Sequence, residues 1–420
     1  MIRFAILIAL FPLILVKEGK AQFAGDTSQF SKYRFGGYGE ILYKNMDYGA
    51  DRYNYPDGSQ PENRSTTGLP RAVFSFEYKF RSDIQLVSEI EIEYGGTGTA
   101  LELEYEESGE YEMEIEKAGE VALEQLYLQK AFSPAIKIKV GHIIVPIGRL
   151  NACHLPTEFF TSSRPEGESQ IIPTTWHETG IAVLGNIKNW AYEVQLVSGL
   201  DANGFSRANW VRSGYQRLFE ESKATQMAGV LRIENQSLPS TLFSFSAYLG
   251  NAAKNTSKPE KMNDIKGTVS ILSGDFEFNN KRIIGRGSIL YGSLSDSYEI
   301  GAINQTLSKN IQYPRTPVAQ SALTYSFELG YDIFTHFRSS EKLIPFVRFE
   351  YYNSMEQTSK GVLADERFNR NLFTAGLNYY LLPGVGVKVD YSHRVIDNGN
   401  YNAENTLGIV VFYSTFFTMK

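Results

Sequence analysis

The residue types that most often bind a metal ion, or act as a nucleophile and its base, gather in one part of the chain. Cys153 and His154 are adjacent, with His142 before them and His177 after them. Their spacing matches no recognised zinc site, and the chain contains neither C-x-x-C nor H-E-x-x-H. A nucleophile also needs a base held beside it, and the 5 histidines of the chain form no convergent set. We therefore expect that the protein is not an enzyme and that it has no catalytic residue and no metal ligand. We interpret these residues as buried or hydrogen-bonded parts of a loop.

Charged residues of both signs occupy the surrounding segment, 146–178, which prolines stiffen. If this segment narrows a channel, its mixed charges create a transverse field that orients polar solutes. Alternatively, Arg149, Glu158 and Arg164 pin the segment to a neighbouring wall through ion pairs, and the two interpretations are compatible. The candidate constriction residues are Arg149, His154, Glu158, Arg164, Glu166 and Glu168.

A further group of side chains that could bind a ligand is acidic. Residues 101–106 and 111–116 alternate apolar residues with glutamate on either side of a glycine-containing link at 107–110. This pattern predicts a β-hairpin inside a long loop over 94–119, with a row of carboxylates on one face. Carboxylate oxygens are the ligands that Ca²⁺ and Mg²⁺ prefer. A Ca²⁺ site is therefore one interpretation, and a solvated acidic rim is the other.

The elements that would hold these groups are short segments with regular alternation. Residues 71–80, 84–92 and 385–392 alternate apolar or aromatic side chains with charged or small polar ones. Alternation over about ten residues is typical of a tilted membrane-spanning strand with one apolar and one polar face. A soluble β-sandwich, the alternative, has shorter strands and a fuller apolar core.

The whole chain, read in this way, predicts about sixteen strands, an even number as in bacterial single-chain barrels. Their connections alternate between tight turns, such as 81–83 and 188–189, and long loops, such as 44–70 and 199–225. In outer-membrane barrels the tight turns are periplasmic and the long loops extracellular. The predicted fold class is therefore an all-β, transmembrane antiparallel β-barrel. Its strands are predicted at 33–43, 71–80, 84–93, 120–130, 136–145, 179–187, 190–198, 226–234, 241–249, 267–278, 282–292, 321–332, 344–352, 370–380, 385–394 and 405–417.

The beginning of the chain predicts export. A basic residue, an apolar run and a small-x-small site before Gln22 are typical of a cleaved signal peptide over 1–21, and an uncleaved anchor is the alternative. The barrel would then span 22–420 and lie in the cell outer membrane, in contact with its lipid. A chain whose only cysteine is Cys153 forms no internal disulfide. Its formal net charge of −6 argues against nucleic-acid binding.

One stretch of the chain resembles a known family. The segments 140–151 (VGHIIVPIGRLN), 154–158, 164–165 and 171–180 (IIPTTWHETG), with 120–127 upstream, are similar to Bacteroidetes porins of the phosphate-selective porin O and P family. The specific match covers about 90–190, and beyond it only the strand rhythm is similar. The resemblance implies a sixteen-stranded porin in a Gram-negative outer membrane, commonly a homotrimer.

The charges expected inside the barrel bear on what would pass through it. Phosphate-selective members of that family have a ladder of arginines along the pore, and this chain shows no clear ladder. Inward-facing positions instead carry both signs in similar numbers, so no field of one sign is expected to concentrate anions. The prediction is a weakly selective diffusion channel for small hydrophilic solutes or ions; an anion- or phosphate-selective channel and a closed structural or adhesive barrel are the alternatives. The predicted pore-lining residues are Lys137, Lys139, Arg286, Arg348, Glu350 and Lys388.

Overall fold

The computed structural model describes residues 32–52, 55–105, 111–216, 222–307, 315–337 and 340–418, without the side chains of 95–105, 111–120 and 416–418. The predicted signal peptide, 1–21, and the predicted hairpin link, 107–110, lie outside these residues. Most of the described chain belongs to one antiparallel sheet that closes on itself.

The sheet closes because the first strand pairs on both sides. β1 (Tyr33–Tyr48) pairs with the last strand, β17 (Glu404–Thr418), and on its other side with β2 (Pro61–Gly68) and β3 (Arg71–Arg81). β2 lies against the second half of β1 and β3 against the first, so β2 and β3 share one position in the sheet. The break between them falls at Pro70, which has no N–H to donate to the ladder. The barrel therefore has sixteen strand positions.

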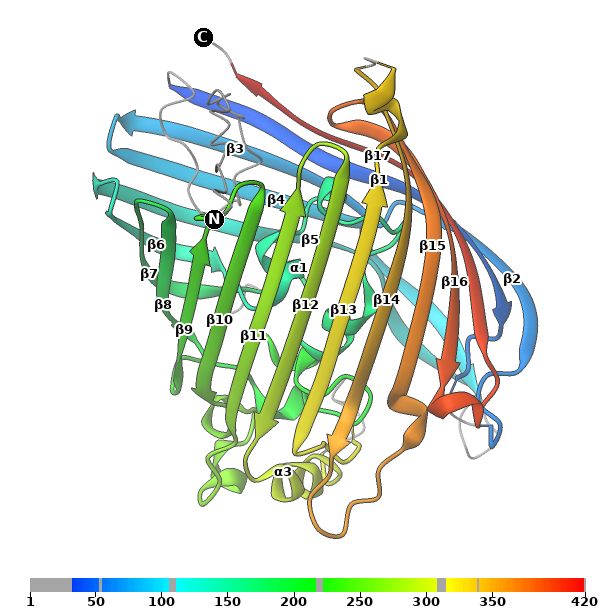
Figure 1. Ribbon diagram of the computed structural model, residues 1–420. Coiled ribbons are helices and arrows are strands. Elements are labelled where there is room, and N and C mark those ends of the chain that lie inside the picture. The colour runs from blue at the N-terminus through cyan, green and yellow to red at the C-terminus, as the bar shows by residue number, and fades with distance from the viewer. Residues whose placement is uncertain are drawn as a thin grey trace, which may run out of the picture.

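The other strands follow in chain order, each hydrogen-bonded to the next (Figure 1). They are β4 (Ile84–Tyr105), β5 (Tyr111–Ser133), β6 (Ile136–Ile144), β7 (His177–Ile187), β8 (Trp190–Ser198), β9 (Met227–Asn235), β10 (Thr241–Asn251), β11 (Thr268–Asn279), β12 (Ile283–Leu294), β13 (Ser321–Tyr331), β14 (Lys342–Gln357), β15 (Asn369–Leu382) and β16 (Val385–Ile396). The predicted barrel fold is confirmed, and each predicted segment overlaps one of these strands.

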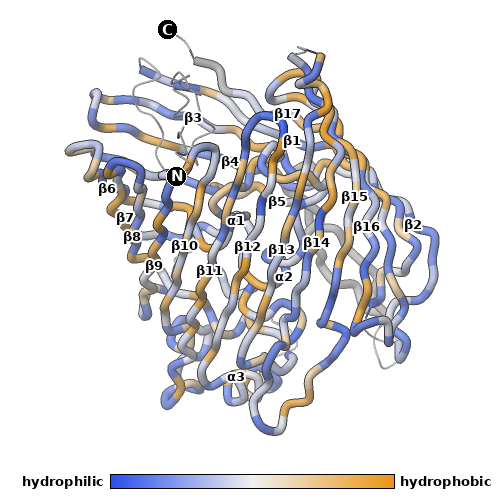
Figure 2. The backbone as a smooth tube through the Cα atoms, viewed as in Figure 1, coloured by the Kyte–Doolittle hydropathy of each residue, from blue (hydrophilic) through white to orange (hydrophobic). Residues whose placement is uncertain are grey.

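Alternation along the strands places apolar side chains outside and polar side chains inside. In β8, Val194 and Leu196 are about half exposed, whereas Glu193 and Gln195 are buried. This is the reverse of a soluble protein, in which large apolar residues are buried and charged residues are exposed. Figure 2 shows the alternation as a change of colour along each strand. An apolar outer band around a polar interior suits a barrel surrounded by lipid.

Short turns and long loops lie at opposite ends of the barrel. β3–β4, β5–β6 and β7–β8 are each joined by two residues, at the end where β1 begins and β17 ends (Figure 1). The long loops at the other end contain helical segments such as α3 (Ser297–Asn304). Among the described residues, no helix is both long and apolar enough to cross a membrane.

The region 94–119 contains more strand than a loop would. β4 and β5 continue past the body of the barrel and pair as far as Tyr105 with Tyr111, with irregular register between Glu93 and Gly98. The two arms of the expected hairpin are thus continuations of barrel strands. The physical reason is that the alternation of apolar residues and glutamate continues the period-two pattern that precedes it.

Candidate functional site

The loop between β6 and β7 folds into the barrel instead of extending away from it. It contains α1 (Gly148–Ala152), a 3-10 turn, η2 (Pro156–Glu158), and α2 (Glu166–Ile171). Asn151 holds the neck of this loop together. Its side-chain amide donates to the carbonyls of Ile147 and Pro173, both at 3.0 Å, and its Oδ1 accepts from the backbone N–H of Trp176 at 2.8 Å. The loop therefore enters and leaves the wall at one point.

α1 begins with a turn that requires glycine. Gly148 has a φ of +76°, in the left-handed region. A Cβ at this position would lie 2.5 Å from Oε2 of Glu168, whose carboxylate accepts from the backbone N–H of Leu150 at 2.9 Å. The Glu168 side chain thus joins α1 to α2, and burial raises the pKa of its carboxyl. Glu168 holds the loop in shape as well as lying beside the lumen.

Lys388 on β16 fastens the loop to the barrel wall. Its Nζ donates to the backbone carbonyls of Pro156, Phe159 and Thr161 at 2.6, 2.7 and 3.1 Å. The side chain is fully buried at 0 % exposure. Lys388 is among the predicted pore-lining residues, and that assignment stays a prediction. The Lys388 side chain points inward, and the folded loop covers it. Its ammonium group has three N–H donors, and each of the three loop carbonyls accepts from it.

Other strands hold the loop from several directions. Asp390 of β16 accepts from the backbone N–H of Ser162, and Glu350 of β14 accepts from that of Gly167 at 2.9 Å. On the opposite side, Arg232 of β9 donates to the carbonyl of Gly148 at 3.3 Å. The loop is therefore attached to the wall on more than one side of the barrel.

A row of alternating charges crosses the wall beside the loop. Its members come from the loop and from β11, β12, β13 and β14, and each arginine contacts the carboxylates next to it, with closest N–O distances between 2.7 and 3.3 Å. We call this set the ion-pair chain; in order it is Arg149, Glu277, Arg286, Glu328, Arg348 and Glu350. Three positive and three negative groups face each other. The ion-pair chain carries no net charge, but it presents fixed charges of both signs.

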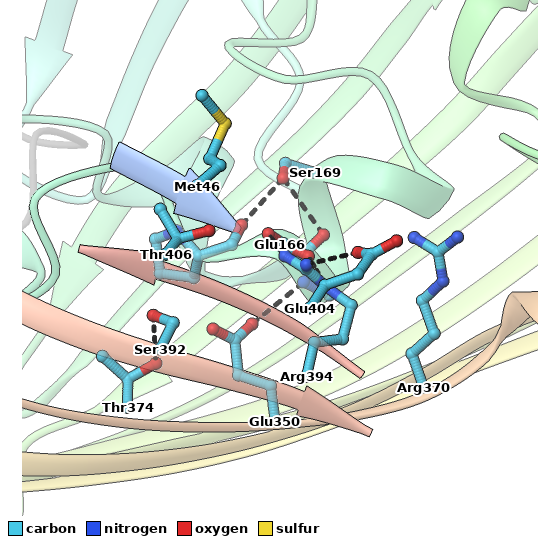
Figure 3. A network of polar contacts seen from close by, with 12 residues as sticks. Met46, Glu166, Ser169, Glu350, Arg370, Thr374, Ser392, Arg394, Glu404 and Thr406 are labelled. Carbon is cyan, nitrogen blue, oxygen red and sulfur yellow. Dashed lines mark hydrogen bonds and ion pairs between the residues drawn. The ribbon is translucent and has the colours of Figure 1, made fainter. Parts of the chain in front are cut away.

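A second group of charges holds α2 against β16 (Figure 3). Glu166 pairs with Arg394 and accepts from the hydroxyl of Tyr352 at 2.7 Å, and Arg394 pairs with Glu404 at 2.6 Å. Burial alone would raise the pKa of the Glu166 carboxyl, but the positive charges of Arg394 and Arg52 lower it to about 2. Glu166 is thus an anionic anchor of the loop at neutral pH.

The predicted site residues separate into distinct places. One cavity between the loop and the wall brings together part of both predicted sets, and its lining includes Arg149, Glu158, Glu168, Arg286, Arg348 and Glu350. Lys137 and Lys139 lie elsewhere, on β6 near Glu193, with Lys139 Nζ 3.5 Å from that carboxylate. The assignment of these residues to the constriction and the pore lining stays a prediction.

His154 and Arg164 face another part of the wall, near Tyr38 of β1. The rings of His154 and Tyr38 are 6.0 Å apart between centroids, and the backbone carbonyl of His154 accepts from Arg71 at 3.2 Å. Burial, followed by the nearby charges of Arg164 and Arg71, lowers the pKa of the His154 imidazole to about 3. The ring is therefore neutral at neutral pH.

Glu277 was missed from the predicted pore lining, although it links Arg149 to Arg286. It lies on the inner face of β11 with the buried Asp275, which pairs with Arg232 at 3.1 Å. Alternation in this strand is interrupted by glycine and small residues, which obscured its inner face. Two acidic residues two positions apart, hence on one face, were the signal available in the sequence.

Comparison with known proteins supports the architecture. No protein-family model matches the chain. An uncharacterized protein of Aquifex aeolicus is 26% identical over 358 residues, which are 85% of this chain and 74% of that protein. The solved structure of Salmonella typhi OmpF in complex with daunomycin has a TM-score of 0.55 at 8% identity, covering 91% of this chain and 97% of that one. An anion-selective porin from Comamonas acidovorans has a TM-score of 0.53 at 7% identity, covering 91% and 99%. At these identities the two structures share the fold with this chain.

Proposed function

We propose that this protein is an outer-membrane channel through which small hydrophilic solutes or ions diffuse passively, with weak selectivity. The observation that carries the proposal is the ion-pair chain beside a loop folded into a sixteen-stranded barrel. Arg286 and Arg348 each contact Glu328, at 2.8 and 2.7 Å, so neither arginine is available as a single-sign charge for an anion. A passing solute would meet both signs in fixed positions, which orients polar molecules without strongly favouring anions or cations.

The outer surface and the resemblance support the membrane part of the proposal. An apolar outer face over the strands needs lipid around it. We infer that residues 1–21 are removed on export and that the barrel lies in a Gram-negative outer membrane. The phosphate-selective porin family, suggested by residues 140–180, and a homotrimer belong to this proposal as well. Crosslinking of the protein in native membranes tests the trimer, and a ladder of only one or two subunits would exclude it.

The solved porin from Comamonas acidovorans is described as anion-selective, which raises the main alternative for this chain. Anion selectivity would require basic lumen residues with no acidic partner. Here Arg149 lies 2.7 Å from Glu277, and Arg232 lies 3.1 Å from Asp275. This pairing supports weak selectivity over an anion-selective or phosphate-selective channel.

A closed structural or adhesive barrel is the second candidate function, and the attachment of the loop favours it. Lys388, Asp390 and Arg232 all hold the loop backbone inside the barrel. A loop attached on several sides fills part of the lumen and resists displacement. The two functions differ in whether ions cross the folded protein.

Single-channel recording in a planar bilayer under a salt gradient separates these functions. We expect stepwise openings with a reversal potential near zero for the weakly selective channel. A large reversal potential of anionic sign, with block by inorganic phosphate, would replace it with the phosphate-selective function. Absence of conductance from protein shown to be folded would replace it with the closed barrel.

A further inference from the structure

A second set of polar side chains lies inside the barrel, in contact with the same loop. Glu89 of β4, Glu124 of β5 and His154 of the loop each present one ligand atom, and these atoms all lie within 4.8 Å of one another. The three residues are 3 %, 0 % and 1 % exposed. Two carboxylates and an imidazole converging in a buried place are the donor set of a divalent metal site.

A β-bulge creates this convergence. Glu89 pairs with Gln125, but the next residue, Ile90, pairs with Leu123, so Glu124 is an extra residue in β5. Glu124 and Gln125 are in consequence both buried, although neighbouring residues of a strand normally face opposite sides. A bulge of this kind re-aims a side chain and is common next to functional sites. Without it, Glu124 would face the lipid.

Among the described residues, two of the three proposed ligands lack a side-chain partner, whereas the carboxylate of Glu89 accepts from the side-chain amide of Gln125. Within the described part of the chain, neither carboxylate oxygen of Glu124 and neither ring nitrogen of His154 has a hydrogen-bond partner. Buried polar atoms are nearly always paired, and an unpaired group calls for a bound ion or water as its partner. Two fully buried side chains aimed at one point therefore indicate a ligand that binds there.

The charges of the surroundings indicate the sign of that ligand. We call Glu89, Glu91 and Glu124 the acidic cluster; all three are buried. Arg71 nearby is paired with Glu40 at 2.8 Å. Arg164 is the other arginine near Glu91 and Glu124 among the described residues. Three carboxylates opposite one guanidinium leave two negative charges uncompensated, and burying such charges is costly. A divalent cation supplies the missing charge.

We propose that Glu89, Glu124 and His154 bind one divalent transition-metal ion of the Zn²⁺ class. The imidazole ligand favours Zn²⁺, Co²⁺ or Ni²⁺ over Ca²⁺ and Mg²⁺, which prefer an all-oxygen shell. Because His154 belongs to the loop and the two glutamates belong to the wall, the metal would fasten the loop to β4 and β5. The site was not predicted from the sequence, since its ligands come from three separate segments and one depends on a bulge. The proposal stands whether or not the barrel conducts.

The test measures binding of Zn²⁺, with Co²⁺ as a spectroscopic probe, by the refolded protein after treatment with a chelator. The background is Cys153→Ser, so that the neighbouring thiol cannot bind the metal. We expect one tightly bound ion, weakened more than about tenfold by Glu124→Gln or by His154→Asn. The matched control is His336→Asn, which changes an exposed histidine in the turn between β13 and β14. It should leave binding unchanged.

Two results would overturn the proposal. One is no stoichiometric binding of Zn²⁺ or Co²⁺ by folded protein. The other is binding that Glu124→Gln leaves intact, which would place the ion at His142 and His177. Should the variants fail to fold, X-ray absorption of the Zn²⁺-loaded parent protein decides the matter. A shell with one imidazole and carboxylate oxygens supports the site, and a shell with two imidazoles overturns it.

Discussion

The ion-pair chain and the acidic cluster lie inside the same barrel and near the same loop, but their charges are arranged differently. In the ion-pair chain every carboxylate has an arginine partner, as Glu328 has Arg286 and Arg348. In the acidic cluster, Glu124 has no hydrogen-bond partner within the described residues. Buried charges are tolerated when they are paired. The wall that carries the ion-pair chain is therefore electrostatically complete as folded, whereas a cation from solution would complete the acidic cluster.

The sharpest way to break the ion-pair chain is to remove its central carboxylate. Glu328→Gln leaves Arg286 and Arg348 buried without their shared anion. We expect the free energy of unfolding to fall by about 3–5 kcal/mol, as for other broken buried pairs. Urea titration in detergent micelles measures this loss. Glu299→Gln, at an exposed position of α3, is the matched control and should be neutral. A fall in the free energy of unfolding below about 1 kcal/mol would show that water already solvates the ion-pair chain.

The next largest effect concerns attachment of the loop. Lys388→Met removes the donor to three loop carbonyls and should cost about 2–3 kcal/mol, the range for hydrogen bonds to a charged group. Because the loop is then held on fewer sides, conductance should also become larger or noisier. Unfolding and single-channel recordings measure the two effects. Lys360→Met, at an exposed loop position, is the control. Unchanged stability and conductance would contradict the role given to Lys388.

Acid should weaken the contact between α2 and β16. The pKa of Glu166 is about 2 in the folded chain, below the ordinary value of 4.5. A lowered folded-state pKa contributes stability that is present above the ordinary pKa and lost as the pH falls toward 2. After discounting for the partial exposure of this side chain, we expect about 1–2 kcal/mol to be lost over that range. Glu166→Gln should remove this part of the pH dependence. Identical acid profiles for the two proteins would refute the assignment.

The smallest expected effect is on ion selectivity. Arg149→Glu reverses a charge at the loop end of the ion-pair chain, which should shift permeability toward cations. The Coulomb energy at a passing ion is on the order of 1 kcal/mol, or about fivefold in the permeability ratio. Reversal potentials measure the ratio. Arg81→Glu, at the exposed end of β3, is the control. Adding Glu277→Arg to Arg149→Glu should restore the pairing and most of the original permeability ratio. If the single variant does not shift the ratio and the double variant does not restore it, the ion-pair chain lies away from the ion path.

Much of the barrel could be predicted from local pattern. The alternation in 71–80 places Phe74 and Phe76 outside and Ser75 and Glu77 inside, and the structure has the same arrangement. Alternation with a period of two residues depends only on neighbouring positions, so it can be recognised in the sequence without knowledge of the rest of the fold.

The contacts of the candidate site depended on folding of the whole chain. Lys388 binds backbone carbonyls more than 200 residues away in the sequence. Every residue has such a carbonyl, so the residue types do not indicate which ones Lys388 contacts. Glu124 sits at a bulge, where the alternation that predicts inward and outward faces fails. The loop residues were predicted as a group because they are clustered in sequence. Their division between the ion-pair chain, the acidic cluster and Arg394 required the three-dimensional arrangement.

The pairing of β1 with β17 has a consequence for how the protein is made. Phe35 lies opposite Phe417, so the first strand acquires its second neighbour only when β17 has been synthesised. Until then the sheet has two free edges, whose unpaired N–H and C=O groups cannot be satisfied in a lipid core. A partly synthesised chain is therefore not a smaller closed barrel, because its sheet still has two free edges. It must be kept from aggregating in water until the last strand arrives.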